Sequence, residues 1–174
     1  MKPPDIQPTG RERTFPEDEI IVSKTDPKGI ITYANRTFLN VALYSETEIL
    51  GQPHSIVRHP DMPRCVFKLL WDTIERGSEI FAYVKNMAKN GDHYWVFAHV
   101  TPTFDPARKI IGYHSSRRRP DAHQIVIAEG LYRQLKQEEN KYHDWKKGME
   151  AATKMLLQAV AEKKMEYDEF VFSI

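Results

Sequence analysis

The sequence predicts an α+β protein, in which a five-stranded antiparallel sheet carries short helices on one face and continues into a C-terminal helical extension. Three observations lead to this fold class. Two β-rich runs lie near the N-terminus, three more follow a helical middle, and helical patterns fill the chain after residue 120. Strands that pair through short turns, with helices gathered between them, are typical of α+β domains.

The first two strands are predicted at residues 19–24 and 30–34. Both runs are rich in β-branched residues, which fit a pleated and half-buried surface. The segment between them, Asp26-Pro27-Lys28-Gly29, has the composition of a tight turn. The two strands therefore form a hairpin.

Two short helices are predicted after this hairpin. Asn35 occupies an N-cap position for a helix that runs to about Leu43, because its side chain can accept a hydrogen bond from the first helical turn. Ser45 and Glu48 have the spacing of a capping box, which marks a second helix start.

A longer helix is predicted from Pro63, where a missing N–H costs nothing in the first turn. Gly77 ends it as a C-terminal cap. Four apolar residues recur along it at i, i+3, i+4 and i+7 and form one helix face: Phe67, Leu70, Trp71 and Ile74.

Three further strands complete the sheet. Residues 80–89 and 92–102 flank Asn90-Gly91, which is a strong signal for a two-residue hairpin turn. The last strand covers residues 109–118. The basic run after it, residues 117–119, is interpreted as the solvated end of this strand.

The chain after the sheet is predicted to form a helix over residues 121–135 and a longer helix over residues 141–170. The longer helix has a narrow apolar seam, at spacings of four and three, that consists of Trp145, Met149, Ala152, Leu156 and Ala159. Such a seam suits a second copy of the chain, in a homodimer, or a fold-back onto the open face of the sheet. We therefore divide the chain into an N-terminal arm (1–18), a central domain (19–119) and a helical extension (120–174).

The composition and the motif content of the chain argue against several classes of function. A net charge of +1 over 174 residues gives no reason to expect nucleic acid or a membrane surface as a partner. Cys65 is the single cysteine, and the seven histidines lack ligand spacing, so no metal site is expected. No apolar run approaches the roughly 20 residues of a membrane span, and a cytoplasmic protein is expected. Catalytic motifs are also missing, so we expect neither catalytic residues nor an enzyme.

Two segments carry the most specific information. Residues 51–63 read Gly-Gln-Pro-His-Ser-Ile-Val-Arg-His-Pro-Asp-Met-Pro, and residues 84–96 read Val-Lys-Asn-Met-Ala-Lys-Asn-Gly-Asp-His-Tyr-Trp-Val. Together with the order of strands and helices, they resemble the PAS domain of bacterial aerotaxis receptors. The resemblance runs from about Thr25 to Leu135.

This resemblance implies a noncovalently bound FAD, rather than FMN or haem. It also implies that the flavin site includes Asn35, Arg58, His59, Asp61 and Asn86. An aromatic residue such as Trp71, Phe81 or Tyr94 is expected to pack near the flavin ring or the adenine. The chemistry of these side chains suits the assignment. Arg58 has a fork of donors for a pyrophosphate, and Asn86 offers the donor and acceptor that a flavin edge requires.

Several alternatives stay open. Arg58 and Asp61 can instead form a structural ion pair, and His59 can be a haem ligand in a gas sensor. The chain has Ile80 where the family has a Trp, and His54 where the blue-light branch of PAS domains has its reactive cysteine. A cofactor-free adaptor that dimerises through its last helix is a further possibility.

The expected function is a cytoplasmic sensor that reports redox state or oxygen to an unidentified signalling protein, as in aerotaxis and chemotaxis. A change in flavin charge and hydrogen bonding would act on Asn86 and its hairpin, and then on the helices after Arg119.

Overall fold

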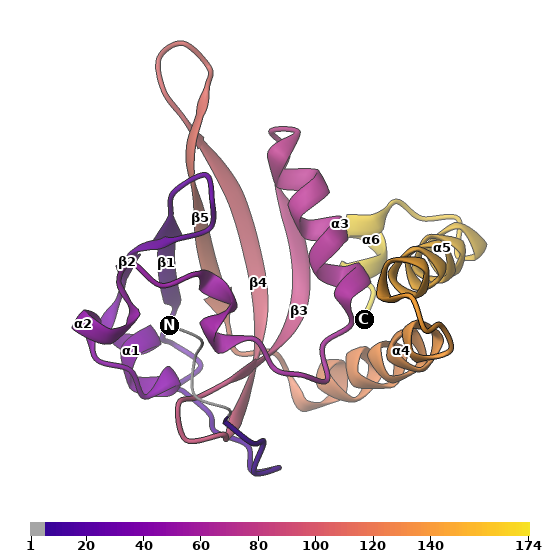
Figure 1. The fold of residues 1–174 in the computed structure, drawn as a ribbon, viewed down its shortest axis with the longest axis horizontal. Coiled ribbons are helices and arrows are strands. Elements are labelled where there is room, and N and C mark those ends of the chain that lie inside the picture. Colours follow the sequence, from indigo (N-terminus) through magenta and orange to yellow (C-terminus); the bar gives the residue numbers. More distant parts are fainter. Residues whose placement is uncertain (1–5) are drawn as a thin grey trace.

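The computed structural model describes residues 6–174, so the first five residues of the expected N-terminal arm lie outside the described part. Its centre is one five-stranded antiparallel sheet with the order β2-β1-β5-β4-β3 (Figure 1). The strands are β1 (Ile21–Thr25), β2 (Ile31–Ala34), β3 (Ile80–Met87), β4 (His93–Phe104) and β5 (Ile110–Arg118). The predicted fold class is confirmed, and β3 and β4 form the expected hairpin. Its loop is longer than the predicted two-residue turn, because the Ala88 amide donates to the Asp92 oxygen and the Gly91 amide donates to the Ala88 oxygen.

Four helical segments lie between β2 and β3 in the chain and cover the inner face of the sheet. They are α1 (Arg36–Ala42), α2 (Glu46–Ile49), the 3₁₀ helix η1 (His54–Val57) and α3 (Arg64–Glu75). Asn35 caps α1 through its side chain, and Ser45 with Glu48 forms the predicted capping box of α2. Pro63 is the N-cap of α3 and does not enter the helix.

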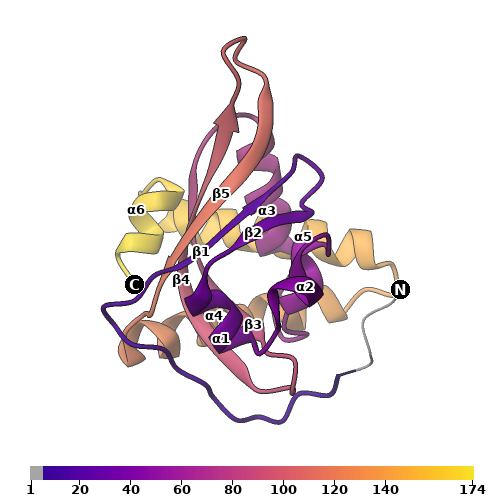
Figure 2. The same ribbon diagram turned by 90° about the vertical axis from the view of Figure 1, so that its left-hand side faces the viewer.

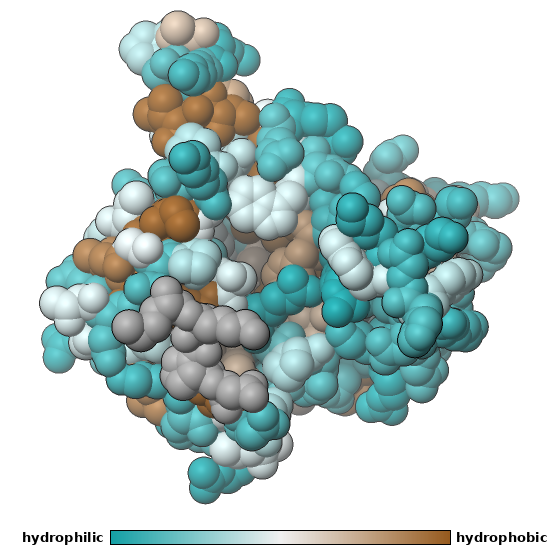
Figure 3. Space-filling model, viewed as in Figure 1, coloured by the Kyte–Doolittle hydropathy of each residue, from teal (hydrophilic) through white to brown (hydrophobic). Residues whose placement is uncertain are grey.

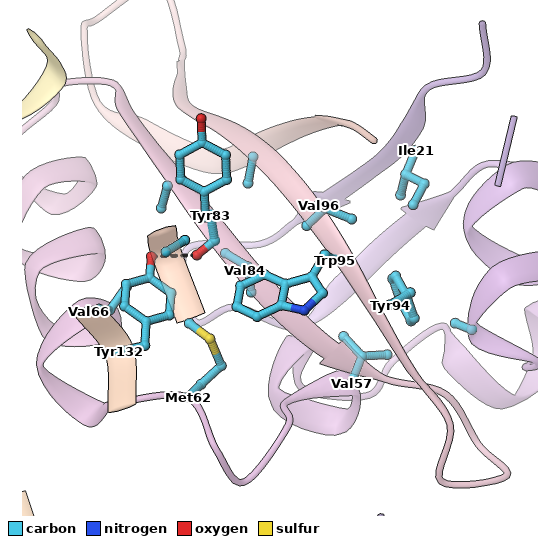
Figure 4. Packing of buried hydrophobic residues seen from close by; sticks show 14 of the residues in the cluster. Ile21, Val57, Met62, Val66, Tyr83, Val84, Tyr94, Trp95, Val96 and Tyr132 are labelled. Carbon is cyan, nitrogen blue, oxygen red and sulfur yellow. Dashed lines mark hydrogen bonds between the residues drawn. The ribbon is translucent and has the colours of Figure 1, made fainter. Parts of the chain in front are cut away.

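Two C-terminal helices cover the outer face of the sheet (Figure 2). The Tyr132 hydroxyl of α4 (Ala122–Asn140) donates a 2.6 Å hydrogen bond to the backbone oxygen of Tyr83 in β3. Figure 4 shows this bond beside Met62 and Trp95 in the core. Phe172 of α6 (Tyr167–Phe172) packs on Phe81, with ring centroids 4.7 Å apart. Among the described residues, no helix is long and apolar enough to cross a membrane.

The single helix predicted over residues 141–170 is wrong, because the structure has two helices there. α5 (Trp145–Glu162) ends in a turn in which Lys164 adopts a positive φ of 55°. Glu166 then starts α6 with its own capping box. The left-handed turn at Lys164 and the capping box at Glu166 therefore interrupt the helix that the sequence pattern predicted as continuous.

The seam of α5 folds back within the chain, but onto helices and not onto the sheet. Ala152 and Leu156 are fully buried, and α5 packs along α4 and against α3. The α4–α5 hairpin (residues 122–162) thus passes around the β3 edge, from the outer face of the sheet to α3 (Figure 1).

Glu139 and Gly148 hold this hairpin together and fix it to α3. The Glu139 side chain is buried, and one carboxylate oxygen accepts a 2.8 Å hydrogen bond from the backbone amide of Cys65. Gly148 lies so close to the backbone oxygen of Glu139 that any Cβ at this position would collide with it. The same turn of α4 therefore contacts both α3 and α5.

Candidate functional site

A cavity of about 510 Å³ lies between α3 and the inner face of the sheet. Its volume is in the range of roughly 300–1,000 Å³ that is usual for small-molecule and cofactor sites. Figure 3 shows a hollow near the middle of this side of the molecule, with apolar residues in its depth. The apolar face predicted for α3 forms one wall, because the cavity lining includes Phe67, Leu70, Trp71 and Ile74.

The lining of the cavity carries a net positive charge, although Lys68 is paired with Asp72 at 2.6 Å and Arg64 lies 3.8 Å from Glu139. The lining itself contains no aspartate or glutamate among residues 6–174, although the chain as a whole is nearly neutral. Cations inside such a low-dielectric space favour an anionic ligand, because water cannot screen them fully. The five cationic residues are Lys28, Arg58, Arg64, Lys68 and Arg117.

Arg117 is the most unusual of these cations. Only 2% of it is exposed, which corrects the expectation that residues 117–119 are the solvated end of a strand; Arg118 and Arg119 are indeed exposed. Its guanidinium lies 4.6 Å from the centre of the Phe38 ring and donates to the Ser23 hydroxyl. Its Nε and Nη1 have no hydrogen-bond partner within residues 6–174. Burial lowers the pKa of Arg117 to about 10, so the group remains charged at neutral pH.

His54 lies next to this cation on the cavity wall. Its Nε2 is 3.1 Å from the Ser23 hydroxyl. Since Ser23 accepts from Arg117, its own proton is free to go to Nε2, which leaves the imidazole proton on Nδ1. Burial, and then the charge of Arg117, lower the pKa of His54 to about 3. The ring is neutral and acts as an acceptor for Ser23.

Asn86 and Arg58 meet at the edge of β3. Asn86 is buried and lines the cavity, and its backbone forms an isolated antiparallel bridge with Arg58. The Arg58 guanidinium lies 4.3 Å from the centre of the Phe67 ring, also at the cavity wall. Burial and the nearby charge of Arg64 lower the pKa of Arg58. The two side chains therefore present an amide and a guanidinium to the same space.

Trp71 closes the cavity toward the β1–β2 turn. Its indole packs edge-on to Tyr113 at 5.6 Å and lies against Gly29. A Cβ at Gly29 would be 2.9 Å from the indole, and the residue also has a φ of +79°. Only glycine satisfies both conditions without displacing the ring.

The three other predicted site residues lie outside the cavity lining. Asn35 caps α1: its side-chain oxygen accepts from the amides of Phe38 and Val22, at 3.1 and 3.0 Å. Its amide nitrogen donates to the backbone oxygen of Ile20. The side chain is therefore occupied by the backbone of β1 and α1.

His59 and Asp61 belong to a second group of residues, on the outer side of β3. The buried His59 ring accepts from the Asp61 amide at 3.1 Å. The Asp61 carboxylate binds Lys85 at 2.9 Å, so the alternative ion pair with Arg58 is not formed among the described residues. His59 does not line the cavity, and a haem ligand there has no support from its position.

Several residues of the cavity were not predicted as site residues from the sequence, among them Arg117, Trp145 and Met149. Arg117 shares a strand face with Tyr113 by period-two alternation, and this spacing is the signal that identifies it. Trp145 and Met149 of α5 also line the cavity, and they come from a part of the chain for which no site was expected.

Comparisons with known proteins agree with this architecture. The family described as "PAS fold" matches residues 31–117. The aerotaxis receptor of Escherichia coli (strain K12) is 42% identical over 127 residues, which are 73% of this chain and 25% of the receptor. A nitrogen fixation regulatory protein of Klebsiella pneumoniae is 27% identical over 57% of this chain and 20% of its own length.

Among solved structures, the light state of the blue-light photoreceptor Aureochrome1 LOV is similar, with a TM-score of 0.57 at 24% identity. The similarity covers 63% of this chain and 88% of that structure. This similarity shows that the two chains share the same fold. This chain spans about a quarter or less of the curated receptors and regulators that it matches.

Proposed function

The chain belongs to the PAS fold family and has a PAS domain of the aerotaxis-receptor type, and on this basis we propose that it is a cytoplasmic FAD-binding sensor that reports redox state or oxygen to a signalling protein. The single observation that carries the proposal is the cationic, carboxylate-free cavity, with Asn86, Arg58 and Trp71 on its walls. We further propose that residues 19–119 form the sensor and residues 120–174 the output module.

The residues of the cavity suit a flavin dinucleotide. Asn86 offers a donor and an acceptor to a heterocyclic edge, and Arg58 offers paired donors to a phosphate. Arg117 is buried with two unpartnered nitrogens, and such a cation favours a ligand that brings acceptors or negative charge. The bound flavin would supply the redox chemistry, and these side chains would orient it.

Strand β3 provides a physical route from the cavity to the C-terminal helices. Asn86 points into the cavity, whereas its neighbour Lys85 points to the outer face of the sheet, because side chains alternate along a strand. Lys85 lies 3.5 Å from Glu129 of α4. A change in the hydrogen bonds of Asn86 therefore acts on a strand that is tied to α4 by this ion pair and by Tyr132.

The absorbance spectrum of freshly purified protein, with the released ligand identified by mass, tests this proposal. Flavin bands in the near-ultraviolet and blue and an FAD mass support it. The Asn86→Ala and Arg58→Ala variants should lose most of the bound flavin, and full occupancy in both would contradict the assigned site. Colourless protein that also fails to bind added FAD would favour a cofactor-free adaptor.

A further inference from the structure

The mouth of the cavity is built partly by the C-terminal hairpin. Trp145 and Met149, at the start of α5, line the cavity together with Arg58, Arg64 and Lys68. Both α5 residues lie well beyond residues 31–117, which match the PAS family. The cofactor cavity therefore extends outside the PAS domain proper.

Trp145 is a large aromatic residue at an exposed position. About 51% of it is accessible, and it also lines the cavity. The Lys146 ammonium lies 5.6 Å from the ring centre. An exposed indole next to cations is well suited to stack on a nucleobase whose phosphates bind those cations.

The cations at the mouth also indicate a ligand that contains phosphate. Arg58 and Arg64 lie close enough for Arg64 to lower the pKa of Arg58 by repulsion. Arg64 has one carboxylate neighbour, Glu139, at 3.8 Å, and Glu139 already accepts from the Cys65 amide. An anion between the two guanidinium groups relieves the repulsion and satisfies their donors.

We propose, resting on the flavin-binding function above, that Trp145 and the basic residues at the mouth hold the adenosine diphosphate end of the cofactor. The inner cavity, with Asn86 and Arg117, then holds the flavin ring, and Trp145 stacks on the adenine. The α4–α5 hairpin is thus part of the cofactor site itself, and it makes the site selective for the dinucleotide over the mononucleotide.

Calorimetric titration of the full-length apoprotein with FAD, FMN and ADP tests this assignment. The wild type should bind FAD at least about tenfold more tightly than FMN, and ADP alone should compete with FAD. Trp145→Ala should weaken FAD about tenfold or more and leave FMN unchanged, as expected from the loss of one stacked base. The basic residues would bind the phosphate of either flavin, so Trp145 is the discriminating position.

Tyr142→Ala is the matched control, since Tyr142 is similarly exposed, at 42%, in the preceding turn and does not line the cavity. It should leave the affinity for both flavins unchanged. Equal losses of FAD and FMN affinity in Trp145→Ala, or no loss of FAD affinity, would overturn the inference while the flavin-binding function stands. A wild-type protein that binds neither flavin would overturn both.

Discussion

The carboxylate of Glu139, in the last turn of α4, accepts a 2.8 Å hydrogen bond from the backbone amide of Cys65, in the first turn of α3. This bond joins two residues that are 74 positions apart in the chain. It forms at the first turn of a helix, where the backbone amides have no partner within the helix. Arg64 and Lys136 lie near the same carboxylate, at 3.8 and 4.0 Å. Glu139 therefore connects the C-terminal hairpin to the wall of the cavity.

Glu139→Ala should lower the free energy of unfolding by about 1–3 kcal/mol, because the Cys65 amide loses its buried acceptor. Glu139→Gln keeps one carbonyl oxygen and should cost less. Chemical denaturation measures both. The neighbouring Glu138→Ala removes a surface contact to Lys141 and should change stability by about 0.5 kcal/mol or less. Equal effects of Glu138→Ala and Glu139→Ala would contradict the bridging role.

Gly148→Ala should destabilise the protein by about 1–3 kcal/mol, because the new methyl group would collide with the backbone of Glu139 and separate α5 from α4. Gly130→Ala is the control in the same hairpin, since nothing lies within 4 Å of a Cβ there. It should be neutral or stabilising by up to about 1 kcal/mol, as alanine is the better helix former. Thermal unfolding of both variants checks this contrast, and similar melting temperatures would refute it.

Stability should fall in mild acid because of His59. Burial, and then the charge of Lys85, lower the pKa of His59 to about 4, from an ordinary value of 6.5. Between pH 6.5 and 4 the unfolded chain therefore binds more protons than the folded one. The stability present above pH 6.5 is lost as the pH falls, by up to about 1.4 kcal/mol per pH unit.

Denaturation of His59→Asn across this pH range tests the assignment. The asparagine oxygen can still accept from the Asp61 amide, but it does not titrate. The free energy of unfolding of the variant should depend less steeply on pH than that of the wild type. The parts due to His54, His93 and His114, whose pKa values burial also lowers, should be retained. A His59→Asn slope equal to that of the wild type would exclude His59 as the source.

Arg117→Met should have opposite effects on the apoprotein and on flavin binding. Exchange of a buried, poorly paired cation for an apolar side chain of similar length should leave the thermal stability of the apoprotein equal or higher. FAD affinity should fall about tenfold or more, as expected when a hydrogen bond from a charged group is lost. Arg118→Met, at the exposed neighbouring position, should change neither the thermal stability nor the FAD affinity. A destabilised apoprotein with unchanged FAD affinity would assign Arg117 a purely structural role.

The sequence was most informative where local rules decide the structure. The cap at Asn35, the capping box at Ser45 and the Asn90-Gly91 turn each depend on neighbours within a few residues, and all three are present. The apolar face of α3 was also predicted, but its spacing does not tell whether the face covers a core or lines a cavity. That distinction depends on how α3 packs against distant strands of the sheet.

The site was harder to predict because adjacent residues point in different directions. Arg58 lies on the cavity wall, whereas His59 and Asp61, in the same motif, are on the other side of β3. Arg117 was missed because a run of arginines at a strand end is typical of a solvated terminus, and its period-two spacing from Tyr113 was not used. Trp145 reaches the cavity only through the path of the α4–α5 hairpin around β3, which is a long-range property of the fold.

The segment of residues 51–58, which includes η1, pairs with both outer strands of the sheet, and this has a consequence for aggregation. Gly51 and Gln52 exchange backbone hydrogen bonds with Ile31 on β2, and Arg58 forms a bridge with Asn86 on β3. Unpaired strand edges are templates for the addition of another chain, and native proteins commonly cover them. This one segment covers part of both edges. A substitution that detaches it would therefore expose the unpaired backbone groups of β2 and β3 together and promote fibre-like association.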